Sequence, residues 1–300
     1  MRIVLIGGGL GNQLFQYIFF RYGQRCCPEE TWYLDDSEFF ANPMHNGYEL
    51  EKIWGIQANL LSRYFDEDVW EEIIRLRKAR GGASLPAIFS DMGIPLTMVA
   101  ETNDFSYQGK VLRTPTNQFH PEIMQIPEKN IYYHGYWINK NWFTQYREEN
   151  LVELAFPELT DPQNLRYADI IRDCLSVGVH IRRGDFVTVG LALPTEYYQQ
   201  SCRQVLNAHP ESRFFVFSDD VDWCKANEKA LGLDLAPRTV YVTGNDHGKN
   251  YIDAQLMSMC KGLIRGCSTT QKPLGDKHFR AKYDIIGAKE MAKTSGKACT

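Results

Sequence analysis

The sequence predicts an α/β protein of two domains, the second of which contains a doubly wound parallel sheet. Two observations support this fold class. The chain has 300 residues, 44% of them hydrophobic, which suffices for two cores in domains of about 150 residues each. In the second half, strand patterns alternate with helical patterns and few hairpin signals separate them. A boundary near 157–162, a segment with a proline at each end, gives domains of residues 1–160 and 161–300.

The first domain begins with a predicted strand, a glycine loop and a helix. Residues 2–6 are apolar, residues 7–12 read Gly-Gly-Gly-Leu-Gly-Asn, and apolar residues recur at helical spacing over 13–22. Such a loop lets backbone N–H groups face an anion or a polar sugar, although many first βα turns carry glycines for packing alone. It is not a complete dinucleotide fingerprint, because Asn12 replaces the third glycine, and no Gly-Lys-Ser/Thr of a P-loop follows.

The rest of the first domain contains fewer residues that indicate a catalytic or binding role. Residues 35–130 indicate helices and loops, with an amphipathic helix from Glu67 to Arg80 and an irregular segment at 114–130. An aromatic strand, Ile-Tyr-Tyr-His-Gly-Tyr-Trp, follows at 131–137. Its rings suit either stacking on a sugar or filling the core, and the sequence favours neither role.

The sequence of the second domain predicts strands that alternate with helices, as in a parallel sheet. We expect strands at 177–181, 213–217, 238–242 and 263–264, and helices at 165–174, 195–206, 221–231 and 250–261. In such sheets, ligands bind beyond the carboxyl ends of the strands. Polar clusters fall at three of these ends, residues 182–185, 218–220 and 266–270, which therefore predict the site.

The most informative segment is 177–185, Val-Gly-Val-His-Ile-Arg-Arg-Gly-Asp. Side chains alternate along a strand, so His180 and Arg182 share a face, and Gly184 permits the turn that follows. Two guanidinium groups at a strand end suit the oxygens of a diphosphate, which predicts a nucleotide ligand. The alternative is a structural Arg–Asp pair that ties the strand to the loop.

The composition excludes several classes of function. The formal charge is -4, the isoelectric point is near 6.0 and no Lys/Arg-rich block occurs, which argues against a nucleic-acid or membrane-surface role. No apolar run approaches the roughly 18–20 residues of a transmembrane helix, and the N-terminus lacks a signal-peptide pattern. Eight scattered cysteines without a Cys-x-x-Cys spacing indicate neither zinc nor a disulfide framework. We therefore expect a reduced, cytoplasmic protein.

Four motifs lie in order along most of the chain. They are Gly-Gly-Leu-Gly-Asn-Gln-Leu-Phe-Gln-Tyr at 8–17, His-Ile-Arg-Arg-Gly-Asp at 180–185, Phe-Val-Phe-Ser-Asp-Asp at 215–220, and Asp-Ala-Gln-Leu-Met-Ser-Met-Cys-Lys at 253–261. Together they resemble the α-1,2-fucosyltransferases of glycosyltransferase family 11. The resemblance implies a GT-B-like fold, in which two Rossmann-type domains with parallel sheets face each other across a cleft. It also implies inverting transfer from GDP-β-L-fucose, without a cofactor or a metal.

The resemblance assigns residues to each substrate. Donor binding in the second domain would use His180, Arg182, Arg183, Asp219, Asp253, Ser268 and Thr269. The acceptor side, in the first domain, would include Gly9, Asn12, Gln13, Tyr136 and Trp137. Catalysis would rest on Arg182, Arg183 and Asp185, with the arginines neutralising the leaving diphosphate. The sequence does not name the base: Asp185 is one candidate, with orientation of Arg183 as its alternative role, and Asp35, Asp36 and Glu38 of the first domain are the others. Asp219 and Asp220 are equally suited to capping a helix, and as adjacent residues they do not form a metal site.

The chain departs from the family pattern after the last motif. Cys267 replaces an asparagine, Lys272 and Pro273 replace two tryptophans, and residues 138–139 replace Gln-Ser. The leading hypothesis is an α-1,2-fucosyltransferase that modifies a galactose-terminated oligosaccharide for a bacterial surface polysaccharide. A lipid-linked acceptor would bring it to the membrane peripherally. The rivals are a silent GDP-sugar-binding protein and a GDP-sugar transferase of different linkage.

Overall fold

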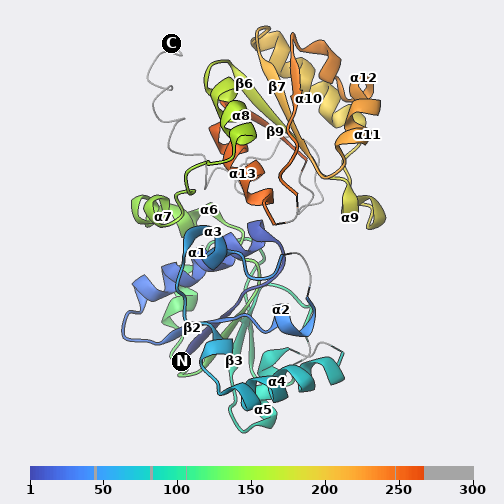
Figure 1. Ribbon diagram of the computed structural model, residues 1–300. Coiled ribbons are helices and arrows are strands. Elements are labelled where there is room, and N and C mark those ends of the chain that lie inside the picture. The colour runs from blue at the N-terminus through green and yellow to red at the C-terminus, as the bar shows by residue number, and fades with distance from the viewer. Residues whose placement is uncertain (44–45, 82–83, 106, 247, 267–300) are drawn as a thin grey trace. The chain divides into compact units, whose positions relative to one another are not determined.

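The computed structural model describes residues 1–43, 46–81, 84–105, 107–246 and 248–266 (Figure 1). The chain divides into two compact units, Met1–Ala155 and Phe156–Thr300, where the sequence predicts a boundary between residues 160 and 161. Each unit contains one sheet, and all the described strands in both sheets pair in parallel. The prediction of an α/β fold with parallel sheets is therefore confirmed.

The sheet of the first unit has five strands in the order β2-β1-β5-β3-β4. The strands are β1 (Arg2–Leu5), β2 (Trp32–Asp35), β3 (Thr97–Ala100), β4 (Val111–Arg113) and β5 (Ile131–His134). The helices are α1 (Leu10–Cys26), α2 (Glu38–Ala41), α3 (Leu50–Trp54), α4 (Glu67–Ala79), α5 (Leu85–Asp91), α6 (Lys140–Thr144) and α7 (Arg147–Glu153), with 3-10 turns at Leu61–Arg63 and Pro121–Gln125.

The prediction of only helices and loops over 35–130 is wrong at two places, β3 and β4. All four residues of β3 are buried, so the strand has no alternation of apolar and polar residues to reveal it. β4 contains only three residues, which is too short for any periodic signal. The predicted glycine loop, the helix after it and the helix that begins at Glu67 are confirmed.

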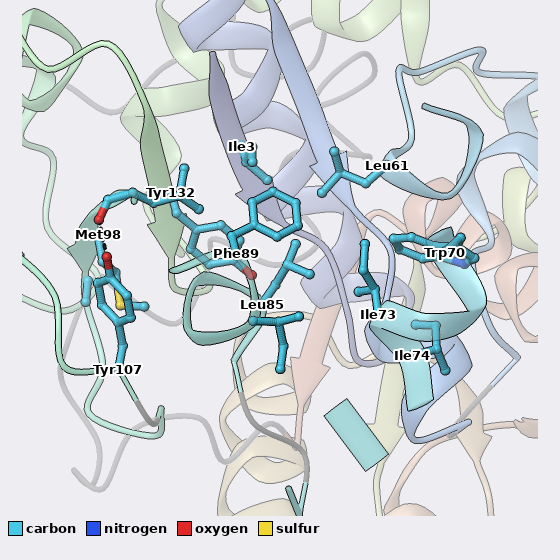
Figure 2. Close-up of a cluster of buried hydrophobic side chains, with 13 residues drawn as sticks. Ile3, Leu61, Trp70, Ile73, Ile74, Leu85, Phe89, Met98, Tyr107 and Tyr132 are labelled. Atoms are coloured by element: carbon cyan, nitrogen blue, oxygen red, sulfur yellow. Dashed lines mark hydrogen bonds between the residues drawn. The ribbon is translucent and has the colours of Figure 1, made fainter. Parts of the chain in front are cut away.

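One core of the first unit lies between its sheet and helices α4 and α5. Figure 2 shows Ile3, Met98 and Tyr132 from the strands beside Ile73 of α4 and Phe89 of α5. These five side chains are at most 1% exposed. Because strand side chains alternate between faces, the neighbours of these strand residues face the opposite layer.

The sheet of the second unit has four strands in the order β8-β7-β6-β9. They are β6 (Ser176–Ile181), β7 (Arg213–Ser218), β8 (Thr239–Tyr241) and β9 (Gly262–Arg265), and they confirm the four predicted strands. The helices are α8 (Pro162–Arg172), α9 (Gly184–Thr188), α10 (Thr195–Ala208), α11 (Val221–Ala226), α12 (Glu228–Leu231) and α13 (Asn250–Met259), with a 3-10 turn at Leu233–Leu235.

The helix predicted over 221–231 is divided into α11 and α12 at Asn227. The side-chain amide of Asn227 donates to the carbonyl oxygen of Trp223 at 2.9 Å, and its backbone leaves the helical region. Asparagine favours such breaks because its side chain competes with backbone hydrogen bonds.

Apolar layers cover both faces of this second sheet. Val179 and Val216 face the layer that contains Tyr198 of α10. Phe217 faces the other layer, which contains Leu256 of α13. Burial on both faces explains why these strands read as nearly continuous apolar runs in the sequence. Among the residues that the structure describes, no helix is both long and apolar enough to span a membrane.

Candidate functional site

The carboxyl ends of β6, β7 and β9 lie next to one another at one edge of the second sheet. The register pairs His180 with Phe217 and Arg265, and Ile181 with Ser218. The polar segments that follow β6 and β7 therefore meet, as the strand order requires. By alternation, the side chain of His180 lies on the same face of the sheet as that of Phe217, which is the face covered by α8 and α13.

The third predicted polar cluster, 266–270, is described only at its first residue. The N–H of Gly266 donates to the carbonyl oxygen of His180 at 2.8 Å, which extends the pairing of β9 with β6 by one residue. Ser268 and Thr269, predicted to bind a phosphate, lie outside the described residues.

Arg182 lies between two carboxylates. Its Nη2 donates to Oδ1 of Asp185 at 2.8 Å, and its Nη1 lies 2.9 Å from Oδ2 of Asp219. The Arg182 side chain remains 36% exposed. Charge-assisted bonds on two sides fix the plane of a guanidinium group, so its accessible part has a defined direction.

Arg183 has a different environment from its neighbour. Its backbone N–H donates to Oδ1 of Asp219 at 2.8 Å, and its Nε lies 3.4 Å from Oδ2 of Asp220. The guanidinium carbon lies 3.5 Å from the centroid of the Trp223 ring, a cation–π contact. Asp220 also accepts the N–H of Trp223 at 3.1 Å and so caps α11. Of the two carboxylates predicted as ligands or caps, Asp220 is a cap and Asp219 pairs with the arginines.

The ion pairs considered as the structural alternative are therefore present at this strand end. They do not cover Arg182, whose partner Asp185 is itself 55% exposed. Gly184 is needed at this position for space: a Cβ atom there would lie 2.6 Å from Oδ2 of Asp219.

Asp253 lies in the first turn of α13 and belongs to a buried polar network. Its Oδ1 accepts a hydrogen bond from the side-chain amide of Asn245 at 2.7 Å. The amides of Asn245 and Asn164 exchange two hydrogen bonds, of 2.8 and 3.1 Å. The side chain of Asp161 in turn accepts from Asn164 and caps α8. Burial raises the pKa of Asp253 to about 6, against the opposing effect of the Asn245 hydrogen bond.

In the first unit, the glycine loop is held by the side chain of Gln13, which is fully buried. Its amide nitrogen donates to the carbonyl oxygens of Gly8 and Gly47, both at 2.9 Å, and its oxygen accepts from Glu49 N–H at 2.9 Å. Gly8 has φ 72°, a left-handed conformation that favours glycine. Gln13, predicted on the acceptor side, thus uses its amide to hold the loop, whereas Gly9 and Asn12 begin α1.

The two aromatic residues predicted on the acceptor side differ in exposure. Trp137 is 1% exposed and stacks on Phe19 of α1, with ring centroids 4.0 Å apart. For Trp137, the core-filling alternative is therefore the one that the structure shows. Tyr136 is 38% exposed, so its ring remains available to a ligand.

Glu101 is a buried residue at the end of β3 that sequence reasoning missed. Its carboxylate accepts the backbone N–H groups of Trp137 at 2.7 Å and Asn117 at 3.0 Å. Within the described ranges, Trp137 and Asn117 are the non-glycine residues with positive φ. Burial raises the pKa of Glu101, and these N–H donors oppose that change. Glu101 belongs to none of the recognised motifs, so only its place after β3, an unpredicted strand, could have indicated it.

The candidate bases of the first unit are largely committed to structural bonds. Asp35 is fully buried and accepts the hydroxyl of Tyr132 at 2.5 Å. Asp36 is 2% exposed, accepts the hydroxyl of Ser62 at 2.5 Å, and has a pKa that burial raises to about 6. The carboxylate of the third candidate, Glu38, lies 2.9 Å from buried Arg77. The geometry therefore selects none of them as the base.

The second sheet of this α/β fold therefore presents, after β6 and β7, two arginines that pair with three aspartates. The model of Glycosyl transferase family 11 matches residues 108–271, more than half of the chain and including that strand end. The protein therefore belongs to glycosyl transferase family 11, and it is a glycosyltransferase. In the described part of the chain, no group of three or more His, Cys, Asp or Glu side chains is arranged to hold a metal.

Curated relatives extend this similarity over most of the chain. An alpha-1,2-colitosyltransferase of Escherichia coli is 28% identical over 268 residues, covering 86% of this chain and 81% of the relative. The O-antigen biosynthesis glycosyltransferase WbnK of Escherichia coli is 26% identical over 283 residues, covering 88% and 86%. The galactoside 2-alpha-L-fucosyltransferase SEC1 of Bos taurus is 31% identical over 94 residues, covering 29% and 24%.

Proposed function

We propose that this protein transfers L-fucose from GDP-β-L-fucose to the 2-hydroxyl of a terminal galactose on a glycan, with inversion and without a metal. The observation that carries the proposal is the guanidinium of Arg182, oriented by Asp185 and Asp219 at the carboxyl end of β6. This strand end lies within the residues matched by the family model. The names of relatives that act through α-1,2 or 2-α linkages support the linkage.

The proposed chemistry needs positive charge at the leaving group. When the bond between the fucose carbon and the β-phosphate oxygen breaks, negative charge grows on the diphosphate. Arg182, with Arg183 behind it, supplies that charge in place of a metal. His180 helps to hold the nucleotide, Asp253 accepts the N–H groups of guanine, and Ser268 or Thr269 donates to a phosphate oxygen.

The acceptor hydroxyl attacks the face of the fucose carbon opposite to the diphosphate, so a β-linked donor gives an α-linked product. A base takes the hydroxyl proton as the new bond forms. We assign the acceptor side to the first unit, with the glycine loop at Gly9 and Asn12 and the exposed ring of Tyr136 as its candidate surface. Among the candidate bases we favour Asp185, because its side chain is 55% exposed, whereas Asp35 and Asp36 are buried.

A second candidate donor is GDP-colitose, which a specific observation favours. The relative that matches over 268 residues is named an alpha-1,2-colitosyltransferase. Colitose is L-fucose without its 3-hydroxyl, and the residues proposed for donor binding serve GDP rather than this part of the sugar. The name of the relative WbnK is in keeping with a product that belongs to a bacterial surface polysaccharide.

The test is a transfer assay with each donor and a panel of galactose-terminated acceptors, followed by GDP release with and without EDTA. Transfer from GDP-fucose that survives EDTA and gives an α-1,2 linkage by NMR supports the proposal. Faster transfer from GDP-colitose would replace the donor, and activity that is lost only with EDTA contradicts the metal-free mechanism. Tight GDP binding without turnover on any acceptor would favour the silent sugar-nucleotide-binding alternative.

A further inference from the structure

Asp219 contacts both arginines of the strand end at once. Its Oδ1 accepts the backbone N–H of Arg183 at 2.8 Å, while its Oδ2 lies 2.9 Å from Nη1 of Arg182. The side chain of Asp219 is 25% exposed, against 55% for Asp185, the other carboxylate on Arg182. Asp219 is thus the more enclosed of the two partners, and it is also anchored to the backbone of Arg183, two residues after the end of β6.

The position of Asp219 follows from the register of the sheet. Ile181, the last residue of β6, lies beside Ser218, the last residue of β7. Asp219 therefore leaves β7 at the level at which Arg182 leaves β6, and a short carboxylate can bridge the two strands.

The backbone on the other side is shaped to admit this carboxylate. A Cβ atom on Gly184 would lie 2.6 Å from Asp219 Oδ2, the oxygen that faces Arg182. Gly184 does not have a positive φ, so its backbone conformation alone would accept alanine. The requirement for glycine here is space for a side chain from the neighbouring strand.

We propose that Asp219 is a positioning residue, which fixes the guanidinium of Arg182 for the diphosphate of the donor, and that Gly184 is required because it leaves room for this carboxylate. A carboxylate repels a diphosphate, so Asp219 acts through Arg182 and does not bind the phosphates itself. The inference rests on the proposed function, since it takes a GDP-sugar as the ligand of Arg182.

The experiment measures two quantities, GDP binding by calorimetry and the turnover of sugar transfer. Both are measured for Asp219→Ala, Gly184→Ala and the double variant. We expect each single variant to weaken GDP binding and to lower turnover by about 10-fold or more, as misplacement of a ligand group does. The double variant should be no worse than Asp219→Ala, because the added Cβ then has no carboxylate to displace. This lack of additivity links the two residues directly.

Asp222→Asn is the matched control. It also removes one negative charge close to the strand end, but its side chain is 98% exposed and pairs with Lys225. Simple electrostatics predicts that loss of any negative charge here strengthens binding of a diphosphate. If Asp219 positions Arg182, the loss of Asp219 should instead weaken GDP binding, and the loss of Asp222 should not.

Four results would overturn the inference. They are GDP binding by Asp219→Ala as tight as in the wild type, additive losses in the double variant, equal losses in the Asp222 control, and a loss confined to the KM for the GDP-sugar. The last would mean that Asp219 affects only the binding of the donor and not the stabilisation of the leaving diphosphate. If Asp219→Ala or Gly184→Ala unfolds below the assay temperature, Asp219→Asn replaces the former, because its amide oxygen keeps the bond to the backbone of Arg183 but loses the charge that faces Arg182. Absence of GDP binding in the wild type would instead reject the proposed function.

Discussion

Replacing Asp253 by asparagine should weaken GDP binding and, at neutral pH, stabilise the protein without ligand. A carboxylate can accept both the N1–H and the 2-amino group of guanine, whereas an asparagine amide offers one acceptor and places a donor against a donor. In the free protein the same carboxylate is partly buried, and its one hydrogen bond in the described structure comes from Asn245. Function and stability therefore make opposite demands on this side chain.

The affinity for GDP and the stability of the protein without ligand should change in opposite directions as the pH falls. Guanine binds the ionised form, so the affinity for GDP should fall as the pH falls through about 6, the pKa that burial gives Asp253. One pH unit below that value the loss is about 10-fold, or about 1.4 kcal/mol.

The stability of the protein without ligand should instead increase as the pH falls. A carboxyl group whose pKa is raised on folding stabilises the fold below its unfolded pKa of 3.8, and this contribution is lost as the pH rises through about 6. At pH 7 the cost of the ionised, buried group is at most about 3 kcal/mol. The asparagine variant should recover part of this amount, because its amide oxygen still accepts from Asn245.

The assay is calorimetry of GDP binding between pH 5 and 8, with thermal unfolding in the same buffers, for the wild type and Asp253→Asn. The β-phosphate of GDP also titrates in this range, but it does so with both proteins, so the difference between the two pH profiles belongs to Asp253. Inosine diphosphate, which lacks the 2-amino group, should bind the wild type more weakly than GDP. Identical pH profiles, or a variant that unfolds at a lower temperature at pH 7, would refute the assignment.

Three further predictions follow from the contacts. Arg182→Ala should lower turnover by about 100-fold or more without unfolding the protein. Arg183→Ala should lower turnover and also the unfolding temperature. Near-normal GDP release by the Arg182 variant would contradict the proposal that Arg182 binds the diphosphate. Glu101→Ala leaves two buried N–H groups without an acceptor and should cost about 2–4 kcal/mol in urea unfolding; a change below about 1 kcal/mol would contradict this. Gly23→Ala places a Cβ 2.2 Å from the ring of Trp32, so its packing cost of about 1–3 kcal/mol should exceed the helix gain of about 1 kcal/mol. Increased stability of this variant would show that the ring moves freely.

The second sheet could be predicted from the sequence because β6 and β7 are six-residue, largely apolar runs and amphipathic helices separate the strands. Each strand from β6 to β9 has an apolar centre and is followed within two residues by a polar residue or a glycine, which indicates both its type and its end. The first sheet gave weaker signals. β3 is four residues long and β4 three. The described residues between them form no helix, so no alternation of strand and helix patterns marks them as it marks β8 and β9.

The candidate site was predictable in its location but not in the division of roles within it. A motif contains residues that contact ligands and residues that hold the backbone in place. The residue types in the motif do not distinguish the two roles. Gln13 and Trp137 were predicted on the acceptor side, yet the structure places the first in the glycine loop's hydrogen bonds and the second in the core. Glu101 could not be found, because its partners lie 16 and 36 residues away along the chain.

The adjacent arginines show what decides such roles. Arg182 and Arg183 are chemically identical, but the register of β6 with β7 gives them different neighbours. Arg182 meets carboxylates at both ends of its guanidinium and keeps an exposed part, whereas the face of Arg183 lies against the ring of Trp223 at 3.5 Å. A guanidinium stacked on an aromatic ring and paired with a helix cap has less surface for a phosphate and more influence on α11. We therefore propose that Asp219 and Trp223, which follow β7 and are separated from the motif by the whole of α10, decide which of the two arginines faces the ligand.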